Sequence, residues 1–181
     1  MEFKFKFLGK TCWFLEVDKK FKIGCNPSFI LKKNSDVKLV SPMDDSFKNI
    51  KLWLITECNP DSFDEEGVKV IEDEAKIVSR KECGKYLRDK KNANIYFVDW
   101  FKKIDLEIKG YKIVVEVIPT YKGGGFLSNP ILGKANGYLV TIVDRLGKIK
   151  RIYVTGETIY QENIIKTLIY YPIDIMIANI G

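Results

Sequence analysis

The sequence contains no histidine among its 181 residues. It therefore lacks both the imidazole ligands of common zinc sites and a histidine base that could activate a cysteine nucleophile. Cysteine is also sparse, because Cys12, Cys25, Cys58 and Cys83 are widely separated and form no C-x-x-C pair. This spacing indicates neither a zinc knuckle nor a disulfide framework, so we expect four reduced, mostly buried thiols.

No apolar run is long enough to span a bilayer, and the N-terminal stretch "MEFKFKFLGK" alternates apolar and basic residues as a strand does, unlike a signal peptide. We expect a soluble, cytoplasmic protein with no membrane partner. Lys and Arg exceed Asp and Glu by 30 to 24, a net charge of +6 that is spread along the chain. This excess mildly favours anionic partners, while the absence of a dense basic run argues against nucleic acid.

The length and a 46% content of hydrophobic residues predict a single globular domain over residues 1–181. Short strands dominate the pattern, with hairpin or tight turns at Gly110 and Gly156 and helices near 80–91 and 160–170. The predicted strands are 3–7, 12–17, 21–25, 52–55, 75–79, 94–99, 101–109, 111–119, 138–143, 150–154 and 173–180. Strands in both halves with helices between them predict an α/β fold in which two sheets form a sandwich flanked by helices.

The stretch "LWLITECNPDSFDEEG", residues 52–67, has the frame of a metal-binding loop with almost none of the ligands. Together with its neighbours it resembles the metallo-β-lactamase-fold hydrolases, especially the small group similar to ascorbate-6-phosphate lactonase. In that family the first strand ends in Gly-His, the third ends in Asp-Pro, and the fourth runs into Thr-His-x-His-x-Asp-His. Here the corresponding strings are Gly9-Lys10, Asn26-Pro27 and "TECNPDS", residues 56–62, in which only Asp61 survives.

The second half of the chain continues the resemblance. Lys122 in "IPTYK" stands where the family has a histidine, Glu157 in "TGETIY" stands at the metal-bridging aspartate, and "IDIMIANIG" resembles the strand that follows. Family members continue past this strand, whereas the sequence stops at Gly181. We therefore expect a domain that lacks the family's C-terminal segment, and a sheet edge that a second copy, a further segment or a partner chain would cover.

The resemblance implies an αββα four-layer sandwich of the metallo-β-lactamase type with a degenerate metal site. No zinc is expected, because a dinuclear site needs imidazoles or thiolates around a bridging carboxylate. The alternative is an oxygen-only site for Mg, Mn or Ca, with Asp61 and Glu157 as metal candidates beside Glu57 and Asn59. The degenerate site positions are Lys10, Asn26, Glu57, Asn59, Asp61, Ser62, Lys122 and Glu157.

Individual residues keep two interpretations. Asp61 is either a residual ligand or base, or the N-cap of a helix beginning near Ser62 or Asp64. Glu57 and Glu157 are either catalytic carboxylates or partners of Lys10 and Lys122 in ion pairs that replace the metal. Asp61 is a further candidate for a catalytic carboxylate.

Two further features also keep two interpretations. Cys58 is either a nucleophile that a nearby lysine or helix N-terminus activates, or a thiol with no chemical role. The loop "YKGGGFLSNPILGKANG", with Lys122 and Lys134, is a phosphate cradle or a surface loop.

Two functions follow. The first is a catalytically degenerate protein that acts as a binding or scaffold module for a small anionic ligand or a protein partner, with no cofactor and as a candidate homo-oligomer. The second is a hydrolase that uses an oxygen-only divalent metal site. The presence or absence of stoichiometric metal separates the two.

Overall fold

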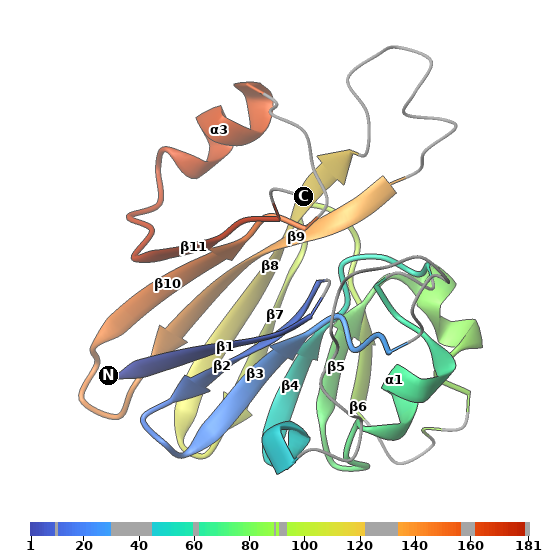
Figure 1. Ribbon diagram of the computed structural model, residues 1–181. Coiled ribbons are helices and arrows are strands. Elements are labelled where there is room, and N and C mark those ends of the chain that lie inside the picture. The colour runs from blue at the N-terminus through green and yellow to red at the C-terminus, as the bar shows by residue number, and fades with distance from the viewer. Residues whose placement is uncertain are drawn as a thin grey trace. The chain divides into compact units, whose positions relative to one another are not determined.

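The computed structural model describes residues 1–9, 11–29, 45–59, 62–88, 90, 94–121, 134–156 and 162–179. The chain divides into two compact units, residues 1–97 and 98–181, and each unit is built around one sheet (Figure 1). Among the described residues, no helix has the length and apolar character needed to cross a membrane.

The first unit contains a six-stranded sheet with the strand order β1-β2-β3-β4-β5-β6, the order of the chain itself. Strands β1 to β3 pair antiparallel, and β3 to β6 pair parallel. The strands are β1 (Phe3–Gly9), β2 (Cys12–Val17), β3 (Phe21–Cys25), β4 (Ile50–Leu54), β5 (Lys76–Ser79) and β6 (Asn94–Phe97). The short helices are η1 (Asp45–Phe47), α1 (Glu65–Lys69) and η2 (Lys81–Lys85).

Strand β4 is deeply buried, because every residue except Lys51 is 0% exposed. A strand with parallel neighbours on both sides is covered on both faces and reads as a continuous apolar run. On one face Trp53 joins a core cluster that includes Val68 of α1 and Ile71. Leu52, which points to the other face, is equally inaccessible.

Strand β1 lies at one end of this sheet and pairs only with β2 among the described strands. The alternation of apolar and basic residues predicted this strand, and the strand forms. Phe5 and Phe7 are nevertheless 48% and 58% exposed. Phe5 contacts Trp13 on β2, with ring centroids 5.8 Å apart. Lys6 donates a hydrogen bond to Ser46.

The second unit contains a five-stranded sheet with the order β11-β10-β9-β8-β7. All its neighbours pair antiparallel except β10 and β11, which pair parallel. The elements are β7 (Lys103–Ile108), β8 (Tyr111–Tyr121), β9 (Lys134–Val143), β10 (Ile149–Val154), α3 (Glu162–Leu168) and β11 (Ile175–Ile177). Helix α3 packs through Ile164 and Leu168 against side chains of β8, β9 and β10.

The predicted turn at Gly110 is confirmed, and Gly110 and Gly156 both have positive φ angles, 79° and 63°. The helix predicted over 80–91 is wrong in type and length. Within the described part of this stretch, residues 80–88 and 90, the chain forms the five-residue 3-10 helix η2, closed by bonds such as Tyr86 N–H to Cys83 O. Gly84 weakens a longer α-helix at this point because glycine has low helix propensity.

Helix α1 approaches the end of β3 so closely that only glycine fits at position 67. A Cβ on Gly67 would lie 1.8 Å from the carbonyl oxygen of Pro27. The obstacle is backbone, so it cannot rotate away as a side chain could. This contact fixes α1 beside the segment that follows β3.

Gly67→Ala is therefore expected to lower the free energy of unfolding by about 3 kcal/mol, at the upper end of overpacking effects. Gly84→Ala is the matched control, because its Cβ would meet only the ring of Phe97, at 3.1 Å, and that ring is half exposed. The control is expected to change stability by less than about 1 kcal/mol. Urea unfolding measures both variants, and equal losses would contradict the close approach.

Candidate functional site

The candidate site of the first unit lies where the parallel strands end. The carboxyl ends of neighbouring parallel strands meet at one edge of a sheet, and ligands of open α/β sheets bind outside that edge. Asn26 follows β3, Thr56 and Glu57 follow β4, and Arg80 follows β5. The edge therefore gathers polar side chains from three successive strands.

Asn26 and Thr56 join the ends of β3 and β4 by reciprocal hydrogen bonds. The Asn26 amide Nδ2 donates to Thr56 Oγ1 (2.7 Å), and the Thr56 backbone N–H donates to Asn26 Oδ1 (2.9 Å). Both residues are buried, and Asn26 has a φ angle of 47°, a left-handed conformation that asparagine tolerates better than most residues. The predicted site position Asn26 is thus a structural link between two strands.

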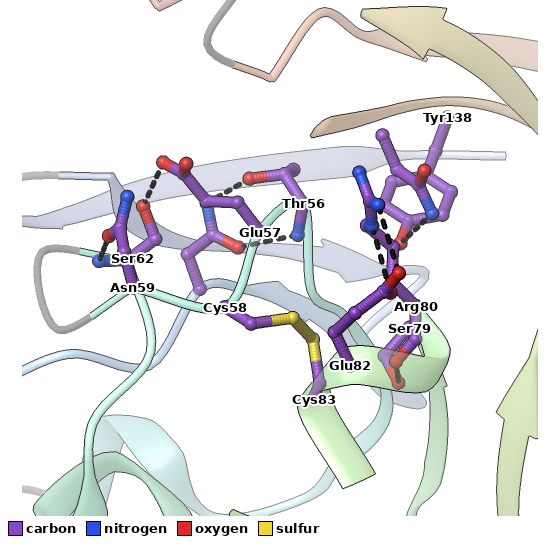
Figure 2. Close-up of a disulfide and its surroundings, with 12 residues drawn as sticks. Thr56, Glu57, Cys58, Asn59, Ser62, Ser79, Arg80, Glu82, Cys83 and Tyr138 are labelled. Atoms are coloured by element: carbon purple, nitrogen blue, oxygen red, sulfur yellow. Dashed lines mark hydrogen bonds and ion pairs between the residues drawn. A yellow bond between two sulfur atoms is a disulfide. The ribbon is translucent and has the colours of Figure 1, made fainter. Parts of the chain in front are cut away.

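Glu57 and Ser62 form the second polar contact of this edge (Figure 2). The Ser62 hydroxyl donates to Glu57 Oε1 at 2.6 Å, and both side chains are buried. The Ser62 backbone N–H in turn donates to Asn59 Oδ1 at 3.0 Å. Three of the predicted positions, Glu57, Asn59 and Ser62, are therefore brought together within one loop and bonded to each other.

Asp64, rather than Asp61, caps helix α1, so the predicted cap is wrong. Asp64 Oδ1 accepts a hydrogen bond from the Gly67 N–H (2.7 Å), while Oδ2 accepts from the Ser28 hydroxyl (2.9 Å) and the Phe29 N–H (2.6 Å). The carboxylate ties the start of α1 to the segment after β3, which Gly67 also approaches. The acidic run that identified a helix start was correct, and only the capping residue differed.

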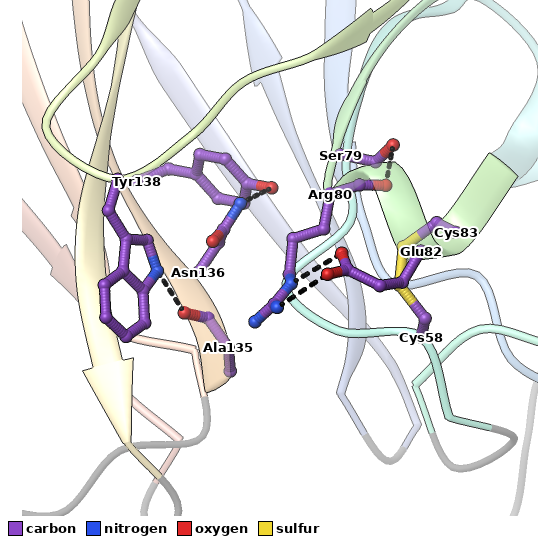
Figure 3. Close-up of polar contacts among 9 residues, drawn as sticks. Cys58, Ser79, Arg80, Glu82, Cys83, Ala135, Asn136 and Tyr138 are labelled. Carbon is purple, nitrogen blue, oxygen red and sulfur yellow. Dashed lines mark hydrogen bonds and ion pairs between the residues drawn. A yellow bond between two sulfur atoms is a disulfide. The ribbon is translucent and has the colours of Figure 1, made fainter. Parts of the chain in front are cut away.

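Arg80 is a functional candidate that the sequence analysis missed, because it was assigned to an exposed helix. Its side chain is only 17% exposed and forms a two-bond ion pair with Glu82, at 3.2 Å from Nε and 3.3 Å from Nη2 (Figure 3). The remaining nitrogen, Nη1, is buried and has no hydrogen-bond acceptor among the described residues. The structure places it directly after the parallel strand β5, but the sequence alone does not reveal that this strand is parallel to its neighbours.

The expectation of four reduced thiols is wrong, because Cys58 and Cys83 form a disulfide. The bridge joins the loop after β4 to helix η2, with Cα atoms 5.1 Å apart (Figures 2 and 3). Cys58 is therefore neither a free nucleophile nor a passive thiol, because its sulfur is part of this disulfide. Cys12 and Cys25 are free and buried, and burial raises the pKa of Cys12 to about 12 and that of Cys25 well above its usual value.

The second unit has polar contacts near the starts of β7 and β9. The Trp100 indole N–H donates to the Ala135 carbonyl (3.0 Å). The Asn136 amide donates to the Tyr138 hydroxyl (3.3 Å) (Figure 3). Lys134, a candidate for the phosphate cradle, lies over the Trp100 ring with its Nζ 4.8 Å from the centroid. Its ammonium group is thus engaged by an aromatic face.

Four predicted site residues lie outside the described residues: Lys10, Asp61, Lys122 and Glu157. The predicted replacement of a metal by lysine–carboxylate ion pairs depends on these residues and stays a prediction. The same holds for Asp61 and Glu157 as metal candidates.

The described residues of this site do not fit zinc. Within the described ranges, no group of three or more His, Cys, Asp or Glu side chains is arranged to hold a metal ion. At the edge itself, both polar atoms of the Asn26 side chain are bonded to Thr56, Glu57 accepts from Ser62, and Cys58 is oxidised. A disulfide sulfur is not the thiolate that zinc requires.

Comparison with solved structures places the fold. The chain is similar to a possible metal-dependent hydrolase from Veillonella parvula DSM 2008, with a TM-score of 0.72 and 16% identity over 98% of this chain and 70% of that one. It is also similar to an isothiocyanate hydrolase from Delia radicum gut bacteria, with a TM-score of 0.71 and 19% identity over 98% of this chain and 71% of that one. The Rm3 metallo-β-lactamase is similar with a TM-score of 0.51 and 7% identity over 96% of this chain and 76% of that one.

These similarities define a mixed α/β fold dominated by two sheets, and the predicted fold class is confirmed. The chain has the fold of the metallo-β-lactamase superfamily. No protein-family model and no curated protein matches the sequence.

Asn26→Ala is expected to destabilise the protein because it leaves the Thr56 N–H and hydroxyl buried without their partner. Asn49→Ala is the matched control, since Asn49 also has a positive φ angle, 66°, but its side chain bonds only an exposed carbonyl, that of Lys20. Backbone strain is then similar in the two variants. The Asn26 variant should be less stable than the control by about 2 kcal/mol in chemical unfolding, and a difference near zero would contradict the buried link.

Proposed function

We propose that this chain is a metal-independent binding module on a metallo-β-lactamase fold, and that it takes a small anion. The observation that carries this proposal is the closed set of hydrogen bonds at the carboxyl edge, where Asn26, Glu57 and Ser62 are occupied by protein partners. The complete absence of histidine adds to it, because the zinc chemistry of the resembled family depends on imidazole ligands.

Arg80 supports an anion as the ligand. Its Nη1 is a buried donor with no acceptor among the described residues, and an unsatisfied buried donor costs about 1–3 kcal/mol. A carboxylate or phosphate oxygen satisfies such a donor with a charge-assisted bond. Glu82 holds the other side of the guanidinium and fixes its plane, and the chain's net charge of +6 attracts anions in general.

The alternative function is a hydrolase with an oxygen-only Mg, Mn or Ca site. Glu57 would have to exchange its bond with Ser62 for a metal ion, and the remaining ligands would have to include Asp61 and Glu157. The metal content of the purified protein decides between the two functions.

Inorganic phosphate and acetate are the probes for the anion site, with binding measured by titration calorimetry. Arg80→Gln is expected to weaken binding of the preferred anion by at least about tenfold, because a charge-assisted bond to an anion is worth roughly 1.5–3 kcal/mol. Arg88→Gln removes the same charge from an exposed position of the same unit and is expected to leave binding unchanged. Equal weakening by both variants would show general charge attraction and contradict an Arg80 site.

Elemental analysis of the purified protein is expected to find no stoichiometric divalent metal, and a chelator is expected to leave the unfolding temperature unchanged. The physical reason is that burial and hydrogen bonds within the first unit hold the edge without a cation. One or two equivalents of Mg, Mn or Ca, together with a large downward shift after chelation, would contradict the proposal and support the metal-dependent hydrolase.

A further inference from the structure

The Cys58–Cys83 disulfide links the candidate-site loop to a different part of the first unit. Cys58 lies between Glu57 and Asn59 in the loop from β4 to α1, and Cys83 lies in η2 after β5. The two residues are 25 positions apart in the sequence. The bridge is therefore a covalent tie between the loop and the neighbouring strand connection (Figure 2).

Hydrogen bonds give this loop its internal shape. Ser62 bonds to both Glu57 and Asn59, so these contacts join loop residues to one another. The disulfide instead anchors the loop to η2, whose Cys83 belongs to the core cluster of the first unit. Breaking the disulfide would leave the internal contacts in place and remove this covalent anchor.

The two cysteine residues differ in burial. Cys83 is 0% exposed, whereas Cys58 is half buried at the rim of the same core cluster. A thiolate in solution therefore reaches the disulfide from the Cys58 side, and thiol–disulfide exchange requires such direct access to one sulfur.

We propose that the Cys58–Cys83 bond is a thiol–disulfide exchange site for a dithiol reductant, and that reduction releases the loop that carries Glu57, Asn59 and Ser62. A reductant thiolate attacks Cys58 Sγ, forms a mixed disulfide and expels Cys83 as a thiolate, which takes up a proton. The second thiol of the reductant attacks the reductant's own sulfur in the mixed disulfide and frees Cys58. Two electrons and two protons pass to the chain, and the reductant leaves as an intramolecular disulfide.

Burial of Cys83 selects a dithiol over a monothiol. Cys83 is held in the core cluster against which Cys58 packs, so after its expulsion it stays beside the mixed disulfide, and its intramolecular attack restores the bridge. With a monothiol, a second reductant molecule must reach the mixed disulfide and cleave it before Cys83 attacks again. A dithiol carries its second thiol within the same molecule and completes the reduction first, because the effective concentration of a tethered group is high.

The free cysteines do not interfere with this exchange. Cys12 and Cys25 are buried, and burial raises both pKa values, so they remain protonated thiols that neither attack the bridge nor compete for the reductant. The exchange is thus confined to one site. The inference requires neither the anion nor Arg80, so it stands or falls independently of the proposed function.

The test uses the full chain and begins with thiol counting by alkylation and mass spectrometry. Without reductant, the unfolded protein is expected to show two reactive thiols, Cys12 and Cys25, and after dithiothreitol it is expected to show four. Four reactive thiols in unreduced protein would overturn the proposal at once. Reduced glutathione at equal thiol concentration is expected to open the bridge at least about tenfold more slowly than dithiothreitol, and equal rates would overturn the dithiol assignment.

Hydrogen exchange then reports the loop. In the native protein, dithiothreitol is expected to speed exchange of the amides of residues 57–59 by at least about tenfold, while the amides of β2 and β8 stay protected. Cys58→Ser is expected to show the fast loop exchange without reductant and no response to dithiothreitol, and Cys25→Ala is expected to respond as the native chain does. Unchanged loop exchange after complete reduction would overturn the release of the loop, and this measurement on the native chain needs no variant to fold.

Discussion

Burial of β4 on both faces is the constraint on which the first unit depends. Parallel partners on either side fix the strand in the sheet, and its apolar side chains exclude water above and below it. Room for Trp53 exists only because Gly24 on the neighbouring strand has no side chain, since a Cβ there would lie 2.7 Å from the indole ring. With β4 held in this way, Thr56 and Glu57 must emerge at the edge beside Asn26.

That edge is organised by hydrogen bonds between protein groups. An asparagine–threonine pair joins two strands, a serine–glutamate pair shapes one loop, and an arginine–glutamate pair follows the third strand. The first two pairs satisfy buried groups that would otherwise lack partners, which is the condition for a stable polar interior.

The sequence predicted the strands and turns well because their signals are local. Alternation identified β1, a short apolar run identified β4, and glycine marked the hairpin at Gly110. It could not give the parallel pairing of β3 to β6, because an apolar run does not encode its partner. Arg80 therefore could not be recognised as an edge residue, and the stretch 80–91 was predicted as a helix.

The motif order named positions of a candidate site but not the contacts among them. The motif order placed Asn26, Glu57, Asn59 and Ser62 at one site, and the structure brings them to one edge, but their hydrogen bonds arise only from the packed geometry. The disulfide was missed because Cys58 and Cys83 are far apart in the sequence and lie in the connections that follow adjacent parallel strands.

The exposed phenylalanines of β1 also affect how copies of the chain meet one another in concentrated solution. An edge strand with an aromatic stripe is a template for pairing with an identical strand. If two copies aligned antiparallel about Phe5, the aromatic residues would match, but Lys4 of each copy would stand opposite Lys6 of the other. Like charges in directly opposed positions disfavour this strand pairing, so Lys4 and Lys6 oppose self-assembly of the chain into fibres.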